Sequence, residues 1–143
     1  MLKKLNLTLV IVSVLLISSC NKVKTKSVEK DITSGTWKIT QFSEDSDDQT
    51  AHFNSYTFTF NDGGTVTATN SNNTISGTWS VTKDKSNDDS SSNVDFILSF
   101  PATDDFDELN DDWDILTQSS SKLELKDVSG GNGGTDLLTF EKK

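Results

Sequence analysis

Apolar and polar side chains alternate with a period of two from residue 36 onward, in short runs rich in threonine, valine and aromatic residues. This alternation is typical of β-strands with one buried face. It predicts eight strands, at residues 36–40, 56–60, 65–69, 78–82, 94–100, 113–115, 123–125 and 138–140. The predicted inward side chains are Trp37, Ile39, Phe58, Phe60, Val66, Trp79, Val81, Phe96, Leu98, Trp113, Ile115, Leu123, Leu125, Leu138 and Phe140.

The segments between these strands are polar and turn-like. Asn61-Asp62-Gly63-Gly64 predicts a tight hairpin turn, because Asn, Asp and Gly tolerate positive φ. Residues 102–110 are compatible with either a loop or a short helix. Sequential hairpins without a helical crossover favour an all-β, antiparallel up-and-down meander, and eight such strands close into a barrel that leaves no free edge. A two-sheet β-sandwich is the structural alternative.

The first twenty residues have the architecture of an export signal. Lys3 and Lys4 precede an apolar run at residues 7–17, and two serines lead to Cys20. The run is about half the ~20 residues that a membrane-spanning helix needs. Ile17, two serines and a cysteine resemble the bacterial lipobox, in which the cysteine is acylated and becomes the mature N-terminus. An ordinary cleaved signal is the alternative.

Three segments follow from this interpretation. Residues 1–19 are predicted to be a lipoprotein signal peptide, residues 20–34 a lipidated Cys20 with a polar tether, and residues 35–143 the barrel domain. Ordering of residues 28–32 against the domain is left open. The predicted location is the cell envelope, with the lipid in the outer membrane and the domain facing the periplasm, because residues 21–24 are basic rather than acidic.

The net charge limits the kinds of partner that the chain is expected to bind. The chain carries a formal charge of −9, and removal of the first 19 residues, which hold two lysines and no acid, takes it to −11. There is no arginine. An acidic surface of this kind lacks the basic footprint that nucleic acid requires. The expected contacts are the membrane, through the N-terminal lipid, and a small hydrophobic ligand, and the domain is expected to be a monomer.

No motif for catalysis, a metal or a cofactor is present. His52 is the only histidine and falls near the predicted start of a strand, without an evident partner. The only cysteine, Cys20, is assigned to the anchor, and no nucleophile-elbow or zinc-protease motif occurs. The chain is therefore predicted not to be an enzyme. Its acidic clusters do not match a calcium-binding EF-hand loop, and calcium-dependent adhesion is a third hypothesis for them.

A family resemblance begins at Gly35-Thr36-Trp37, which is repeated as Gly77-Thr78-Trp79. A Gly-x-Trp at the first strand of an eight-strand meander resembles the lipocalin superfamily, where the Trp packs across the closed end of the barrel. The lipobox, the polar tether, the Gly-x-Trp strand and the later strands together resemble the short lipocalin-like lipoproteins of Bacteroidota-type bacteria. Lipocalins place a late basic residue, usually Arg, over that Trp. This chain has no Arg, and Lys122, Lys126 and Lys142 are the candidates for that position.

The resemblance implies a membrane-anchored lipocalin-like lipoprotein that binds a small apolar or amphipathic ligand. The candidate ligand-binding residues are Trp37, Tyr56, Phe58, Phe60, Trp79, Phe96 and Trp113. The alternative is a structural or interaction lipoprotein of the envelope, with a filled barrel that acts through its loop surface. In that case the same aromatic side chains are core.

Overall fold

A computed structural model describes residues 25–83, 94–128 and 134–143. Within this part of the chain, one α-helix, nine strands and two 3₁₀ helices follow one another. In order they are α1 (Thr25–Ile32), β1 (Trp37–Glu44), β2 (Asp47–Asp48), η1 (Thr50–Phe53), β3 (Thr57–Phe60), β4 (Thr65–Thr69), β5 (Thr74–Lys83), β6 (Val94–Ser99), η2 (Asp104–Leu109), β7 (Asp111–Gln118), β8 (Lys122–Val128) and β9 (Thr135–Lys142).

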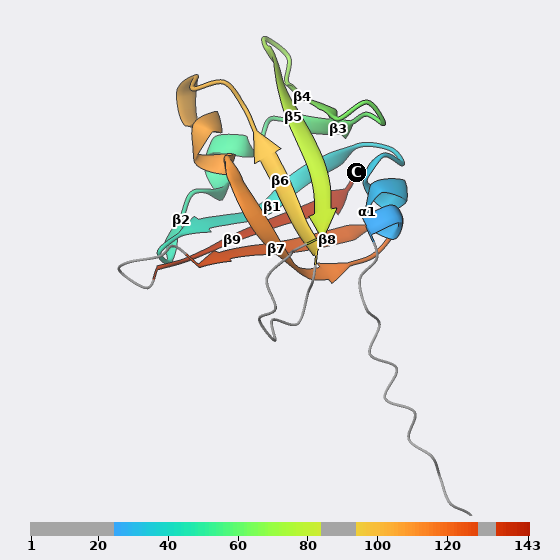
Figure 1. The fold of residues 1–143 in the computed structure, drawn as a ribbon. Helices are drawn as coiled ribbons and strands as arrows, with labels where there is room; N and C mark the ends of the chain where they lie inside the picture. Colours follow the sequence, from blue (N-terminus) through green and yellow to red (C-terminus); the bar gives the residue numbers. More distant parts are fainter. Residues whose placement is uncertain (1–24, 84–93, 129–133) are drawn as a thin grey trace, which may run out of the picture.

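The strands form an antiparallel meander in which each one pairs with the next, and β1 pairs with β9 to close the sheet (Figure 1). β2 is a two-residue hairpin partner at the end of β1. The other eight strands are those predicted from the alternation, and together they form an up-and-down barrel. The sandwich alternative does not occur, because one continuous sheet returns to its first strand.

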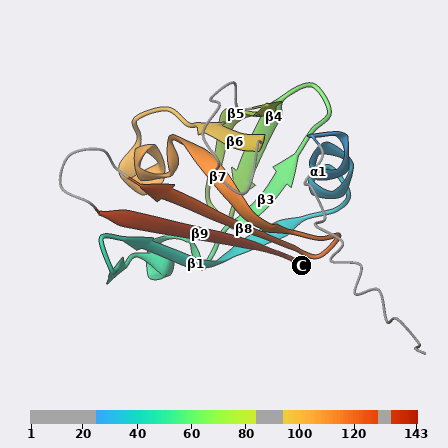
Figure 2. The same ribbon diagram turned by 60° about the horizontal axis from the view of Figure 1, so that its bottom comes forward.

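Short helices cover the two ends of the barrel. Figures 1 and 2 place α1 at one end and the 3₁₀ helices η1 and η2 at the other. Val28 and Ile32 of α1 are buried, as are Phe53 of η1 and Phe106 and Leu109 of η2. Among the described residues, no helix has the length and apolar character needed to cross a bilayer.

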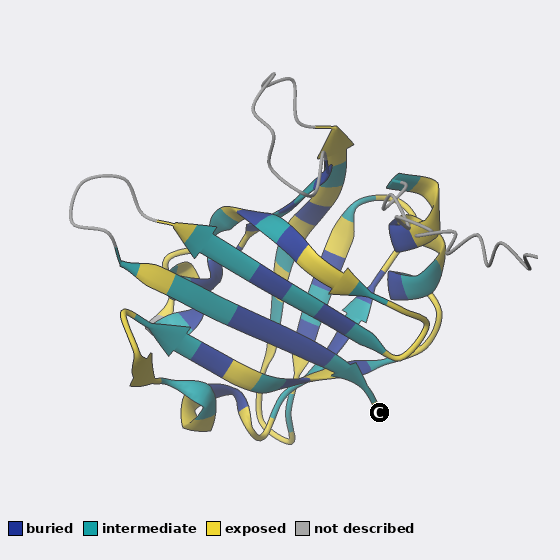
Figure 3. Ribbon diagram, turned by 90° about the horizontal axis from the view of Figure 1, so that it is seen from below, coloured by how far each residue is buried: buried dark blue, intermediate teal, exposed yellow. Residues whose placement is uncertain are grey.

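The predicted inward face is confirmed (Figure 3). Fourteen of its fifteen side chains belong to one buried hydrophobic cluster, and the fifteenth, Val81, packs against that cluster while remaining partly exposed. Since each large aliphatic or aromatic side chain removed from water contributes about 1.5–3 kcal/mol, this cluster is the main source of stability in a chain with no cysteine pair.

Two β-bulges interrupt the strand pairing, and the first changes which side chains point inward. Between Ile39 and Gln41 the register of β1 against β9 shifts, and Phe42 becomes fully buried although strict alternation would expose it. A second shift lies between Ile115 and Thr117, beside Leu116, which is 49% exposed, as alternation from Trp113 and Ile115 would place it. Phe42 is absent from the predicted inward side chains because the period of the sequence pattern does not indicate where a bulge occurs.

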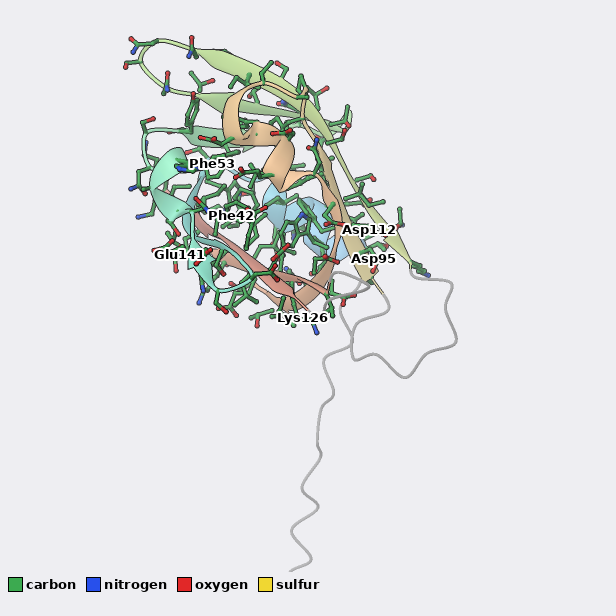
Figure 4. The ribbon with its side chains drawn as sticks, turned by 90° about the vertical axis from the view of Figure 1, so that its left-hand side faces the viewer. Phe42, Phe53, Asp95, Asp112, Lys126 and Glu141 are labelled. Atoms are coloured by element: carbon green, nitrogen blue, oxygen red, sulfur yellow. The ribbon has the colours of Figure 1, made fainter. Side chains whose placement is uncertain are left out.

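The β1–β3 junction is the short seam of the barrel. These strands pair only at Trp37 and Phe58, whereas β1 runs along β9 through most of its length. Past that pair, η1 packs against β1 and brings Phe53 onto Phe42, with ring centroids 5.6 Å apart (Figure 4). Phe53 therefore fills space that a longer strand pair would occupy.

Residues 25–32 lie inside the predicted tether but form α1, whose buried side chains make it part of the packed domain. This answers the question left open for residues 28–32. Cys20 and the predicted signal segment lie outside the described residues, as do residues 84–93 and 129–133.

Candidate functional sites

The barrel interior holds most of the predicted ligand-binding residues. Trp79 stacks on Phe96, with centroids 5.9 Å apart, and Phe60 meets both rings edge-on at 5.8 Å. All three side chains are at most 6% exposed. The indole N–H of Trp79 donates to the Asn61 carbonyl oxygen at 3.0 Å, so its polar atom is satisfied by the hairpin turn.

The aromatic contacts continue through the barrel toward η2. Phe58 meets Phe140 at 5.3 Å, and Phe140 meets Phe60 at 5.4 Å. Phe106 of η2 contacts Phe58 at 6.3 Å and Tyr56 at 4.9 Å. Tyr56 lies just before β3 and is only partly buried, unlike the other predicted ligand-binding residues. Among the described residues, the interior aromatic side chains therefore contact one another.

Trp37 and Trp113 occupy opposite parts of this core. The Trp37 indole N–H donates to the Ile32 carbonyl oxygen of α1 at 2.8 Å. Lys142 Nζ lies 5.3 Å from the centre of the Trp37 ring, which selects Lys142 from the three candidate lysines. Trp113 instead packs on Phe42 and donates its indole N–H to the Leu109 carbonyl oxygen at 3.1 Å, next to η2.

Two polar side chains hold η1 and η2 against the barrel. Thr50 Oγ1 accepts the backbone N–H of Phe42 at 2.8 Å and donates to the carbonyl oxygen of the same residue. Asn110 does the same to Phe100: its side-chain oxygen accepts the Phe100 N–H, and its amide nitrogen donates to the Phe100 carbonyl at 2.9 Å. Phe53 and Phe106 then pack edge-on at 5.3 Å, joining the two helices.

This packing brings His52 next to two carboxylates. His52 Nδ1 lies 3.3 Å from Asp105 Oδ2, and one metal-ligating atom from each of His52, Asp105 and Glu108 lies within 4.8 Å of the others. The prediction that His52 stands near a strand start without a partner was wrong. His52 belongs to η1, and its partners come from η2, more than fifty residues later in the chain. Residue spacing in the sequence does not predict a contact over so long a separation.

The same end of the barrel is crowded with acids. Burial raises the pKa of Glu44 above its usual value, and the nearby charges of Glu108 and Asp136 raise it further. At the start of β7, burial raises the pKa of Asp111 to about 6; the hydrogen bond from the Asp112 backbone opposes this increase, and the nearby charge of Asp127 adds to it. Negative charge is therefore concentrated where η2 meets the ends of β1, β7 and β9.

A surface hollow of about 380 Å³ lies at the α1 end. It is bordered by Glu29 of α1, Asp62 in the β3–β4 turn and the segment Trp79–Val81 of β5. Its acidic rim and its open position on the outer surface distinguish it from the apolar interior that a lipocalin ligand would occupy. None of the predicted ligand-binding residues except Trp79 borders it.

No family model matches the sequence, and no curated protein matches it. Among solved structures, the chain is similar to a DUF4847 family protein from Bacteroides vulgatus, with a TM-score of 0.49 and 19% sequence identity. The match covers 81% of this chain and 97% of the other.

Proposed function

We propose that the chain is a lipid-anchored lipoprotein of the cell envelope whose packed barrel acts through its outer surface, with no catalytic step. The observation that supports this choice is the close packing of the predicted ligand-binding side chains. Six of the seven predicted ligand-binding side chains are at most 6% exposed, and most meet another aromatic ring within 6.5 Å. Helices cover both ends.

Binding of an apolar guest would require these rings to move. Small-molecule sites usually provide roughly 300–1,000 Å³ of preformed space. Displacing even one interior phenylalanine or tryptophan forfeits burial and packing worth about 3–5 kcal/mol, which a small ligand would first have to offset. The filled-barrel alternative needs no such rearrangement, and it is therefore the function that this geometry favours.

The proposed anchor would also orient the domain. Cys20 lies five positions before Thr25, the first residue of α1, and a chain of five residue steps spans at most about 18 Å when fully extended. A lipid on Cys20 would therefore keep the α1 end near the membrane. The η1 and η2 end would then face away from it and be the surface available to partners, in our proposal on the periplasmic side of the outer membrane.

Tryptophan fluorescence provides the test of the filled barrel. Wild-type protein in detergent is titrated with a hydrophobic fluorescent probe, with a matched titration of detergent alone. We expect no saturable, protein-dependent change, because the three tryptophans are buried and packed against other side chains. Saturable quenching with one probe per chain, retained after removal of the N-terminal lipid, would instead favour a ligand-binding barrel.

The anchor has a separate test. Replacement Cys20→Ser should leave an unprocessed or soluble form, whereas the wild-type protein should partition with detergent-extracted membrane proteins. If the serine variant were cleaved and still partitioned with membrane, the lipid attachment at Cys20 would be wrong while the packed-barrel proposal would stand. Co-purification of a stable envelope partner from the same detergent extract would support action through the surface.

A further inference from the structure

The only histidine of the chain stands in a three-residue cluster that two separate helices assemble. His52 comes from η1, and Asp105 and Glu108 come from η2. One ligand atom from each residue lies within 4.8 Å of the others, and the His52 Nδ1 to Asp105 Oδ2 distance is 3.3 Å. Two ligands placed ~2.0–2.2 Å from a tetrahedral zinc ion are about 3.3–3.6 Å apart, so this pair already has the required spacing.

Glu108 supplies an independent observation. Its Oε2 atom is buried and has no hydrogen-bond partner, the one such side-chain atom in the described part of the chain. A buried polar atom without a partner is costly, and more so when it belongs to a carboxylate. The nearby charges of Glu44 and Asp107 are also negative, so they offer no compensation. A cation beside Glu108 would provide the missing partner.

The contact between His52 and Asp105 does not account for this oxygen. Both side chains are well exposed, at 40% and 49%, so water reaches the pair and screens it. Glu108 stands on the same 3₁₀ helix as Asp105, three residues later. If only His52 and Asp105 interacted, the position of Glu108 beside them would have no explanation.

The cluster also has rigid support. Phe53 and Phe106, the residues that directly follow His52 and Asp105, pack edge-on in the core at 5.3 Å. Thr50 fixes the start of η1 to the Phe42 backbone, and Asn110 fixes the end of η2 to the Phe100 backbone. Metal ligands need this kind of support, because a metal ion binds more weakly when its binding must also order the ligand side chains.

We propose that His52, Asp105 and Glu108 bind a divalent transition-metal ion, for which zinc is the best fit. One imidazole with two carboxylates is a nitrogen and oxygen donor set that suits zinc and its neighbours, whereas calcium takes oxygen ligands alone. The exposure of His52 and Asp105 leaves room for water to complete the coordination. The proposal does not depend on the lipid anchor or on the filled barrel.

Calorimetric titration of the full-length protein in detergent with zinc chloride tests the proposal, with a purification tag that contains no histidine. We expect saturable binding of one zinc per chain. His52→Gln and Glu108→Gln should each weaken it at least tenfold. Asp62→Asn removes one negative charge at the opposite end of the barrel and should leave zinc affinity unchanged. Circular dichroism of each metal-free variant checks that it is folded.

The single histidine gives a second readout, since every imidazole resonance in an NMR spectrum of tag-free protein belongs to His52. Zinc should shift these resonances in wild-type protein, and zinc should raise the melting temperature of wild type but not of Glu108→Gln. Equal zinc affinity in all variants would show nonspecific binding to an acidic surface and overturn the proposal. So would the absence of binding at millimolar zinc, or stabilisation by calcium with none by zinc.

Discussion

Lys142 Nζ lies 5.3 Å above the ring of Trp37, at the end of the barrel that α1 covers. The first and last strands are joined by this contact as well as by their hydrogen bonds, because Trp37 pairs with Lys142 in the β1–β9 register. Gly35 lies beside this contact: its φ of +94° favours glycine, and a Cβ there would lie 3.3 Å from the Lys142 side chain, closer than an ordinary contact.

We expect Lys142→Gln to lower the free energy of unfolding by about 0.5–1 kcal/mol, because the ammonium group loses its attraction to the indole face. Lys142→Arg should stay near wild type, since a guanidinium group stacks on aromatic rings as well. Urea unfolding followed by Trp fluorescence gives the measurement. Lys83→Gln, at an exposed position on β5, is the charge-matched control, and an equal loss there would mean that only net charge matters.

The second Gly-Thr-Trp needs its glycine for a different reason. A Cβ on Gly77 would lie 2.5 Å from the Ser99 carbonyl oxygen and 2.7 Å from Phe100 Cδ1, so β5 and β6 could not keep their spacing. We expect Gly77→Ala to lower the unfolding free energy by about 1–3 kcal/mol. A Cβ on Gly63, in the turn, would have no atom within 4 Å. Gly63→Ala should therefore change the unfolding free energy by less than about 0.5 kcal/mol. Chemical denaturation distinguishes them, and equal effects would contradict the steric account.

The sequence predicted the strands well because period-two burial is a local property. Thr65 to Thr69 alternates in the sequence and alternates in the structure, and its register with β3 and β5 follows from the hairpin turns. The same rule failed at Phe42, where a bulge shifts the inward face of β1 by one residue. Nothing in a single sequence marks a bulge when the residues on both sides are polar or mixed.

The candidate sites were less predictable than the fold. Lys142 was one of three lysines that the sequence offered as the partner of the Trp37 ring. The β1–β9 register, which pairs Lys142 with Trp37, distinguishes it. The His52 cluster depends on Phe53 meeting Phe106 across the end of the barrel, a tertiary contact between two short 3₁₀ helices. Helix α1 was missed for another reason: only Val28 and Ile32 anchor its eight residues, too few for a clear helical period.

Asp111 should make stability depend on pH. Its pKa in the folded protein is about 6, above the ordinary value of 3.8, chiefly because of burial. The folded state therefore holds this proton more tightly than the unfolded state, and stability should fall as pH rises from about 4 to 6 and stay lower above that. Because the side chain is partly exposed, screening reduces the effect to about 1 kcal/mol.

Replacement Asp111→Asn should remove this part of the pH dependence and stabilise the protein at pH 7.5 but not at pH 3.5. The amide oxygen can still accept the Asp112 N–H that Asp111 Oδ1 now accepts at 2.8 Å. Unfolding free energies of wild type and variant, measured at several pH values, give the difference directly. Asp62→Asn serves as the control for net charge. A constant difference across pH would show that the Asp111 carboxyl is not the titrating group.

Phe106 closes the η2 end by packing on Phe53, Tyr56, Phe58 and Phe100. Removing its ring should leave an apolar cavity connected to the interior. We expect Phe106→Ala to lower the unfolding free energy by about 3–5 kcal/mol and Phe106→Leu by about 1–3 kcal/mol. The leucine variant is the useful one, because it should remain folded while losing part of the contact.

Hydrophobic-probe titration of the Phe106→Leu variant then separates a filled barrel from a ligand-binding one. If the interior is packed, the probe should bind the variant in a saturable manner and fail to bind wild type, since only the variant has room. Leu116→Ala, which trims an exposed side chain on β7, is the control and should bind no probe. Equal probe binding by wild type and Phe106→Leu would mean that the aromatic side chains already yield to a guest, and the surface-acting function would have to be abandoned.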